Sequence, residues 1–182
     1  MIHLPINEHL SLKLPEPGDA PQLFARIDES REHLSKYLPW VEMTKNLHHT
    51  ESYIDYLRSQ FEAKRVCKFS ILCDEEIVGE VGYGFINAKD RSASLSFWLA
   101  SKWEGQGIAT QSARAMIQYG FTELGLNRVE IHCAIDNERA QQVAKRLGFV
   151  EEGRLRQGEC RYDEFVDVFL FGMLKDEWTF NS

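Results

Sequence analysis

The first half of the chain carries apolar residues at two different spacings, which distinguish strands from helices. Apolar and polar residues alternate over residues 9–14, which predicts a strand that ends at the prolines after it. A short helix is expected over residues 31–37. Two longer helices are predicted by apolar stripes at helical spacing, which are typical of core packing. These are Leu23, Phe24 and Ile27 after a cap at Asp19, and Tyr53, Ile54, Leu57 and Phe61 after a cap at Thr50.

In the second half, strands give way to alternating helices and strands. Three strands joined by tight turns are expected over residues 66–73, 77–86 and 92–99. Alternation of strand and helix after them predicts locally parallel strands with right-handed crossovers. We therefore expect an α/β fold with a mixed sheet of about seven strands. The remaining expected elements are a helix to about residue 124 ended by Gly125, a strand over 128–135, a helix over 137–147 ended by Gly148, and strands over 149–157 and 167–174.

Length and composition fit one globular domain, with a core from about residue 9 to residue 178. Of the 182 residues, 43% are hydrophobic and 27% are charged, as in ordinary soluble proteins. No stretch approaches the roughly 18 apolar residues of a membrane span, and residues 1–5 lack the pattern of a signal peptide. We therefore expect a cytoplasmic protein that does not bind membranes. The four cysteines, which show no Cys-x-x-Cys spacing and are read as reduced thiols without a metal, are Cys67, Cys73, Cys133 and Cys160.

The formal net charge of −7 bears on the class of ligand. Binding to a nucleic-acid backbone needs a concentrated basic surface, so this charge argues against nucleic acid as the main ligand. An acidic protein is compatible with a cationic substrate such as an amine, although many soluble proteins are this acidic. The charge therefore excludes one class of partner and supports another only weakly.

The loop between residue 99 and the next helix carries two glycines, Gly105 and Gly107. Glycines let the backbone approach a ligand closely, and the free N–H groups at a helix start form an anion site. A phosphate is therefore expected on residues 106–110. The loop is neither a P-loop, since no Gly-Lys-Ser/Thr follows, nor a dinucleotide fingerprint, since the third glycine is missing. Loops with two glycines before a helix are common, so the motif alone is weak.

Taken together, the motifs resemble a known family. Residues 104–109 (Glu-Gly-Gln-Gly-Ile-Ala), with Asn137 and residues 147–149 (Leu-Gly-Phe) downstream, look like the acetyl-coenzyme A site of the GNAT superfamily of N-acetyltransferases. Residues 98–99, 152–153 and 167–178 look like its RimJ/RimL branch, which acetylates the N-terminal amines of ribosomal proteins. The resemblance covers residues 9–178. It implies a mostly antiparallel sheet with splayed central strands and acetyl-coenzyme A as the cosubstrate.

The resemblance also assigns residues to the coenzyme. The strand before the glycine loop is expected to splay from the strand over 128–135, so that its free backbone groups pair with the pantetheine arm like an added strand. One N–H there can polarise the thioester carbonyl. Asn137 is expected to contact the coenzyme, while its position after Asp136 also fits plain helix capping. The residues carried over are Phe97, Trp98 and Leu99 for pantetheine, and Gln106, Gly107, Ile108, Ala109 and Thr110 for the pyrophosphate.

The same resemblance places the catalytic base at Glu159, a residue that without it would be read as an exposed loop carboxylate. An amine must be neutral to attack a thioester, and an α-amine with a pKa near 8 needs a weaker base than a lysine near 10. The reaction is expected to proceed directly in a ternary complex. Three histidines that could also titrate near neutrality, but are more often structural, are His48, His49 and His132.

Three positions depart from the family pattern. Glu104 stands where the family has Gln or Arg, so it is expected to point away from bound phosphates. Ala140 replaces the serine thought to protonate the leaving thiolate in RimL-type enzymes, and Ala144 replaces the tyrosine of other members. A thiol of pKa about 8.5 can leave without an acid, or with help from Tyr162 or a water.

Three functions remain open from the sequence. The first is acetylation of a protein N-terminus, and the second is the same chemistry on a small amine such as a polyamine, an amino acid or an aminoglycoside. The third is a non-catalytic acyl-coenzyme A binding module, which the missing acid leaves open. RimL-type members commonly pair, and the aromatic content adds a slight indication of an interface, so a homodimer is also expected.

Overall fold

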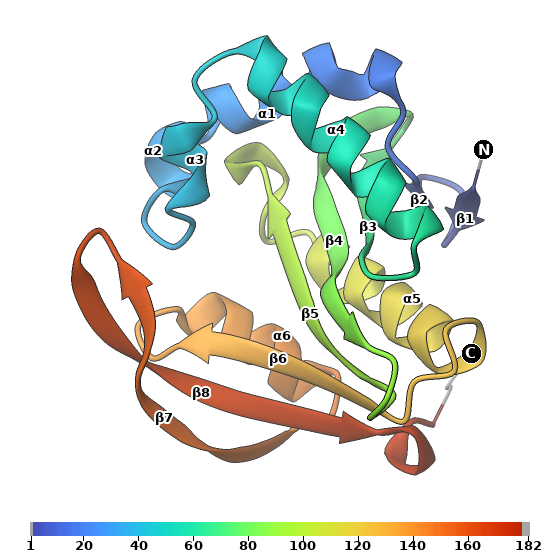
Figure 1. The fold of residues 1–182 in the computed structure, drawn as a ribbon, viewed down its shortest axis with the longest axis vertical. Helices are drawn as coiled ribbons and strands as arrows, with labels where there is room; N and C mark the ends of the chain where they lie inside the picture. The colour runs from blue at the N-terminus through green and yellow to red at the C-terminus, as the bar shows by residue number, and fades with distance from the viewer. Residues whose placement is uncertain (1, 180–182) are drawn as a thin grey trace.

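An eight-stranded mixed sheet forms the centre of the computed structural model, which describes residues 2–179 (Figure 1). The strand order is β1-β2-β3-β4-β5-β6-β8-β7, and all neighbours are antiparallel except β5 and β6, which are parallel. The predicted α/β fold is therefore confirmed. Strand β1 adds to the expected set because three residues are too few to show an alternation. The strands are β1 His3–Pro5, β2 Leu10–Lys13, β3 Cys67–Cys73, β4 Glu76–Asn87, β5 Ser92–Leu99, β6 Arg128–Ala134, β7 Val150–Arg161 and β8 Glu164–Leu174.

Helices cover both faces of this sheet (Figure 1). Helices α1 to α4 lie on one face, and α5 and α6 lie on the other. Short 3₁₀ turns occupy Pro17–Asp19, Ser101–Trp103 and Lys175–Glu177. The helices are α1 Ala20–Glu29, α2 Arg31–Leu34, α3 Trp40–Met43, α4 Leu47–Glu62, α5 Ile108–Thr122 and α6 Glu138–Arg146.

Buried apolar side chains form two clusters, one on each face of the sheet. The larger cluster lies beneath α5 and α6 and contains Phe69, Met116 and Phe171, each fully buried. The smaller one lies beneath α1, α3 and α4 and contains Ile54 and Trp98. Each fully buried side chain of this size contributes about 1.5–3 kcal/mol to folding. The helical stripes predicted from the sequence therefore pack into the core, as expected.

One helix start and one helix end differ from the prediction. Helix α4 begins one turn early, because Asn46 is extended and its side chain accepts a hydrogen bond from the His49 N–H at 3.2 Å. Thr50 lies inside the helix and is only 1% exposed. The helix expected over residues 31–37 ends at Leu34 and continues as a turn over residues 35–37.

The last two strands extend further than predicted. They continue to Arg161 and from Glu164, joined by a two-residue turn in which Tyr162 and Asp163 have φ of 49° and 68°. Two left-handed residues in a row are typical of the tight turns that match the twist of a hairpin. No Asn-Gly pair marks this turn, so the sequence pattern did not show it. As a consequence, Glu159 lies on a strand and not in a loop, which corrects the expectation that it is a loop residue.

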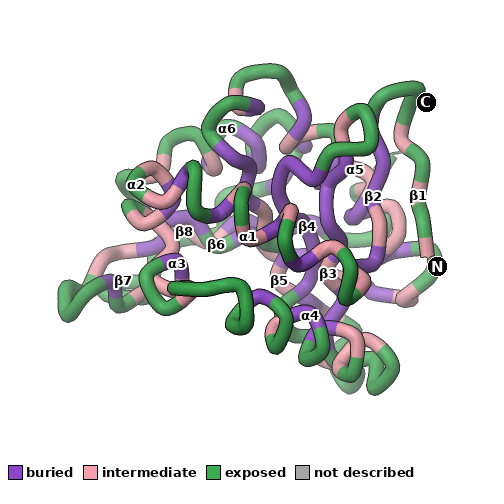
Figure 2. The backbone as a smooth tube through the Cα atoms, turned by 90° about the horizontal axis from the view of Figure 1, so that it is seen from above, coloured by how far each residue is buried: buried purple, intermediate pink, exposed green. Residues whose placement is uncertain are grey.

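Strand β7 is an irregular edge strand. Its register with β8 shifts between Leu155 and Glu159, where Gln157 has a φ of +52°. The Asp167 carboxylate holds this bulge by accepting hydrogen bonds from the Gln157 N–H at 2.8 Å and from Arg154 Nε at 2.6 Å. Most of β7 is exposed (Figure 2). Its bulge leads into the final segment that carries Glu159.

Candidate active site

Strands β5 and β6 separate shortly after they begin. They pair at three positions, the last of which joins Ser94 to Glu130. Beyond it, β5 pairs only with β4 and β6 pairs only with β8, within the part of the chain that the structure describes. The facing edges of the two strands are thus left without a partner strand, and we call this opening the splay (Figure 1). The residues of β5 that border its open end are Phe97, Trp98 and Leu99.

The glycine loop, residues 104–107, follows the 3₁₀ turn Ser101–Trp103 beyond the open end of β5 and leads into α5. Gly105 and Gly107 have φ of +76° and +78°, in the left-handed region that favours glycine. A Cβ at Gly105 would meet no atom of the described chain within 4 Å, and one at Gly107 would meet only Gln111 Nε2 at 3.7 Å. The loop therefore presents bare backbone to an open space.

Helix α5 begins directly after this loop, where the sequence predicts an anion site. Gly107 is its N-terminal cap, and the first backbone bond of the helix runs from the Gln111 N–H to the Gly107 carbonyl oxygen at 3.0 Å. The preceding N–H groups of Ile108, Ala109 and Thr110 have no carbonyl in the helix to bind. Because the positive end of the helix dipole points the same way, this terminus fits a phosphate group.

Glu104 departs from the family pattern, and the structure shows where its carboxylate goes. It binds His33 Nε2 of α2 at 2.7 Å and also binds the guanidinium of Arg139 in the first turn of α6. The carboxylate therefore contacts two side chains from other elements. These contacts tie the loop to α2 and α6. That Glu104 points away from a bound phosphate stays a prediction.

Asn137 lies at the open end of β6, where it caps α6. Its side-chain oxygen accepts a hydrogen bond from the Ala140 N–H at 3.2 Å. This is the plain capping role that the sequence allowed. A contact between Asn137 and the coenzyme stays a prediction.

Glu159 is half-buried near the tip of the β7–β8 hairpin. Its side chain is 36% exposed, and Oε1 lies 3.3 Å from Arg161 Nε. Burial raises the pKa of Glu159 above its ordinary value, the Arg161 charge lowers it, and the Asp136 charge raises it, with a net rise. A carboxylate with a raised pKa is a stronger proton acceptor than a solvated one, which suits a general base.

Arg161 fixes this hairpin against two other parts of the chain. Its guanidinium is buried and donates to Asp136 Oδ1 at 2.7 Å and to the Lys36 carbonyl oxygen at 3.0 Å. It also lies 5.7 Å from the centre of the Tyr37 ring. The residue therefore joins β7 to the segment after α2 and to the β6–α6 loop. Sequence reasoning missed it, because both partners are distant along the chain.

The candidate acids are poorly placed. Ala140 and Ala144 carry no proton donor, and Ala144 is fully buried in the core. The Tyr162 hydroxyl donates to the Ser35 carbonyl oxygen at 2.9 Å at the tip of the hairpin, which occupies its proton.

His48 and His49 both lie in the first turn of α4, where His49 Nδ1 accepts a hydrogen bond from the Lys45 N–H at 3.2 Å.

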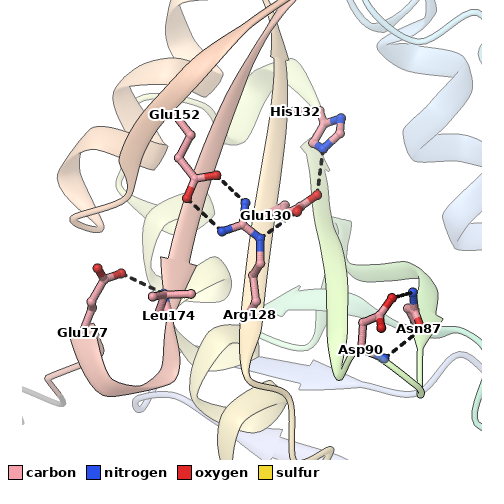
Figure 3. A network of polar contacts seen from close by, with 8 residues as sticks. All are labelled: Asn87, Asp90, Arg128, Glu130, His132, Glu152, Leu174 and Glu177. Carbon is pink, nitrogen blue, oxygen red and sulfur yellow. Dashed lines mark hydrogen bonds and ion pairs between the residues drawn. The ribbon is translucent and has the colours of Figure 1, made fainter.

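His132 belongs to a chain of charged side chains along β6 (Figure 3). Its Nε2 lies 3.1 Å from Glu130 Oε2, and Arg128 Nε donates to Glu130 Oε1 at 2.8 Å. The other two nitrogens of Arg128 donate to the two oxygens of Glu152 on β7. In the sequence, His132 is one of three histidines that could titrate near neutrality, and no pattern there connects it with these three residues.

Glu80 is a buried carboxyl that the sequence did not single out. It lies on β4 opposite Trp98, and its Oε2 accepts hydrogen bonds from Trp98 Nε1 at 3.1 Å and from the Tyr53 hydroxyl at 3.3 Å. Burial raises its pKa, against the lowering effects of Lys68 and of these two hydrogen bonds. Glu80 therefore fixes the side chain of Trp98, near the open end of β5, by a hydrogen bond from the neighbouring strand β4.

Residues 2–179 show neither an arrangement of metal ligands nor a membrane-spanning helix. No group of three or more His, Cys, Asp and Glu among them is arranged to hold a metal ion. No helix among them has the length and apolarity needed to cross a membrane.

The sequence matches the model of one protein family, described as "Acetyltransferase (GNAT) domain", over residues 9–150. The chain belongs to the GNAT acetyltransferase family. Its predicted identity as an acetyl-coenzyme A-dependent N-acetyltransferase of the RimJ/RimL branch is thereby confirmed.

Relatives of this acetyltransferase share most of its length. It is 33% identical to the "Putative ribosomal N-acetyltransferase YdaF" of Bacillus subtilis, over 95% of each chain. It is 27% identical to the ribosomal-protein-serine acetyltransferase of Escherichia coli, over 94% of this chain and 96% of that one. Among solved structures, RimL, a ribosomal L7/L12 alpha-N-protein acetyltransferase in complex with coenzyme A, has the same fold with a TM-score of 0.93. That match has 22% identity and covers 97% of this chain and 100% of the other.

Proposed function

We propose that this enzyme acetylates the N-terminal α-amine of a protein, and that its substrate is a ribosomal protein. The observation that carries the proposal is the splay, which opens next to an anion-binding helix start on one side and to charged side chains on the other. Relatives of similar length are named as ribosomal-protein acetyltransferases, which supports this acceptor.

Acetyl-coenzyme A fits the backbone groups at the α5 end of the splay. The N–H groups of residues 106–110 suit the diphosphate, and the open space at Gly105 and Gly107 leaves room for it. The free edge of β5 at Phe97, Trp98 and Leu99 suits the amide groups of the pantetheine arm, which would pair with it as a strand does. Asn137, which caps α6 just beyond the end of β6, would contact the coenzyme from the other side of the opening.

The amine approaches from the opposite face of the sheet. Helices α5 and α6 cover one face of the splay, so we call the other face, which carries Trp98 and His132, the acceptor face. Glu159 removes a proton from the incoming ammonium group, directly or through a water, and its raised pKa favours this. The neutral nitrogen then attacks the thioester in a ternary complex.

The acceptor site is completed by a second copy of the chain. Edge strand β7 and its neighbour β8 expose Val150, Leu155 and Phe165, with 53%, 41% and 64% of each residue accessible. Long exposed edges with apolar side chains are suited to pairing. Light scattering is expected to give twice the mass of one chain, and a monomer mass would contradict the dimer.

A release assay for free thiol tests the function directly. The enzyme is mixed with acetyl-coenzyme A and either peptides that begin with the N-termini of ribosomal proteins or free amines, including polyamines, amino acids and aminoglycosides. The proposal expects the highest kcat/KM with an N-terminal peptide and little with the same peptide blocked at its α-amine. Preference for a free amine over all peptides would replace it with a small-amine acetyltransferase.

A further inference from the structure

The charged side chains of β6 border the splay, but none of them has yet been given a chemical role. Arg128, Glu130 and His132 alternate along the strand with Val129, Ile131 and Cys133, which lie in the core beneath α5 and α6. The three polar side chains therefore point to the acceptor face. Figure 3 shows them in sequence along β6, with the imidazole at the end toward the splay.

Hydrogen bonding fixes which nitrogen of His132 carries the proton. Burial raises the pKa of Glu130, but hydrogen bonds from Arg128 and His132 and the Arg128 charge outweigh it, so the pKa is lowered. An ionised carboxylate only accepts hydrogen bonds. Nε2 of His132, at 3.1 Å from Glu130 Oε2, is therefore the donor. In the neutral ring, Nδ1 is then an acceptor, and no residue between 2 and 179 binds it.

The position of His132 on β6 places its side chain beside the splay, where acetyl transfer is proposed to occur. Pairing between β5 and β6 ends at Glu130, and His132 is the next residue of β6 on the same face. Had the pairing continued, it would lie opposite Ser96, just before the strand segment proposed to hold the pantetheine arm. Its side chain is 42% exposed, so a substrate can reach it.

The reaction needs a second proton acceptor and a proton donor. An ammonium group loses two protons when it becomes an amide, and Glu159 takes only the first. The departing sulfur needs one proton, and neither Ala140, Ala144 nor the engaged Tyr162 supplies it. We propose that His132 fills both roles by carrying the second proton from the attacking nitrogen to the sulfur. The proposal rests on acetyl transfer at the splay.

The step balances without any further reactant. As the N–C bond forms, the proton on nitrogen moves to Nδ1 of His132, which becomes an imidazolium. As the C–S bond breaks, the electron pair stays on sulfur, and the same proton moves from Nδ1 to it. The ring ends in its starting form. The overall change releases one proton to solvent, the one that Glu159 removed.

Glu130, Arg128 and Glu152 act as positioning residues. Glu130 holds the ring by Nε2 and stabilises the imidazolium, as a carboxylate partner does for a catalytic histidine. Arg128 holds Glu130 ionised, and Glu152 binds the remaining two nitrogens of Arg128, so that its charge is shared by two carboxylates. The trio therefore has one net negative charge beside the ring of His132.

His132→Gln tests the role in catalysis, and His48→Gln is the matched control. His48 is an exposed histidine on α4, with its side chain 82% accessible. For His132→Gln, kcat should fall about a hundredfold, as is typical of general acid–base groups, with little change in the KM of the acceptor. Added imidazole should restore part of the rate to His132→Gly. An unchanged kcat in His132→Gln, or a change in KM alone, would overturn the proposal.

A measurement on the free protein tests the geometry without any coenzyme. Long-range ¹H–¹⁵N spectra report which ring nitrogen of His132 carries the proton. The expected result is a proton on Nε2 in the neutral ring, and a mixture of the two forms in Glu130→Gln. A proton fixed on Nδ1 would contradict the relay.

The two experiments separate this inference from the proposed function. If no amine is acetylated by the unaltered enzyme, the proposed function fails, and the spectra still decide the tautomer. If Glu159→Gln loses activity while His132→Gln keeps it, the function stands and the relay is wrong.

Discussion

The two sides of the splay are constructed differently, one from backbone groups and the other from charged side chains. At the start of α5, the proposed coenzyme site consists of N–H groups and two left-handed glycines within one short loop. On the acceptor face, Glu159 and His132 depend on partners from β6, β7 and the segment after α2. Backbone groups remain the same when side chains change, which explains why Glu104 is tolerated. The acceptor face can change its chemistry by single substitutions, and it is where relatives with different acceptors should differ.

Among the substitutions considered, Gly107→Val should have the largest effect, which is the loss of coenzyme binding at the start of α5. The new side chain is strained at a φ of +78° and fills the space left for the diphosphate. Loss of several hydrogen bonds to a charged ligand, each worth about 1.5–3 kcal/mol, should weaken coenzyme binding about a thousandfold or more. Calorimetry with coenzyme A measures this.

The control for that variant is Gly125→Val. Gly125 follows the other end of α5, with a φ of +65° and open space around its Cβ position. It should lose comparable stability and bind coenzyme A normally. Equal affinities in both valine variants would place the coenzyme elsewhere.

Glu159→Gln should have the next largest effect, which is a loss of catalytic rate on the acceptor face. The substitution keeps the shape and removes the proton acceptor, so kcat should fall roughly a hundredfold. The unaltered enzyme should gain activity as the pH rises through the raised pKa of Glu159, because the base must be ionised to accept a proton. This acidic limb should be absent from the pH–rate profile of the variant.

Glu164→Gln, an exposed carboxylate on the same hairpin, is the control. Should only KM change in Glu159→Gln, Glu159 holds the cationic acceptor without acting as a base.

Glu80→Gln tests whether the buried carboxyl group that binds Trp98 makes the stability of the protein depend on pH. Because burial raises the pKa of Glu80, the folded protein binds more protons than the unfolded chain above the ordinary value of 4.5. Its stability should therefore fall as the pH rises through the raised pKa. The glutamine variant lacks this loss and should gain about 1–2 kcal/mol relative to the unaltered protein at alkaline pH.

Denaturant unfolding at several pH values measures the effect, with exposed Glu76→Gln as the control. Parallel stability curves for Glu80→Gln and the unaltered protein would show that Glu80 does not titrate in this range.

Ala140→Ser should have the smallest effect. Serine restores the hydroxyl that RimL-type enzymes carry, but this chain does not depend on a side chain there for proton transfer to sulfur. The rate should rise slightly or stay the same, by less than about tenfold, which is below a usual acid–base contribution. Steady-state kinetics decides, and a large loss would mean that the site is fitted to the methyl group.

The sequence predicts the backbone side well because its signals are local. Gly105 and Gly107 lie between an apolar strand and a helix, and their positive φ values follow from that position. Most strands were visible for the same reason, one from alternation over residues 9–14 and the others from segments bounded by turn residues. The splay itself came from the family resemblance, since nothing in the residues of β5 and β6 shows that their pairing stops at Ser94 and Glu130.

The side-chain side was predictable only in part. Glu159 was placed by resemblance, but its strand was not, because the turn at Tyr162 lacks the residues that usually mark a hairpin. Arg161 binds Lys36, which lies 125 positions away along the chain. Arg128 binds Glu152, which lies 24 positions away. Such contacts depend on how strands and helices meet, and a linear pattern of residues does not contain that information.

The bond from Arg161 to Lys36 has a consequence for the order in which the enzyme becomes competent. It closes a loop of 125 positions, and contacts of such long range are slow to form and favour late stages of folding. During synthesis, the loop at Gly107 and helix α5 are complete well before the final hairpin is made. A growing chain can therefore assemble the helix terminus proposed to bind phosphate before Arg161, the partner of the proposed base Glu159, has been made. On this proposal, catalytic competence arrives with the last two strands.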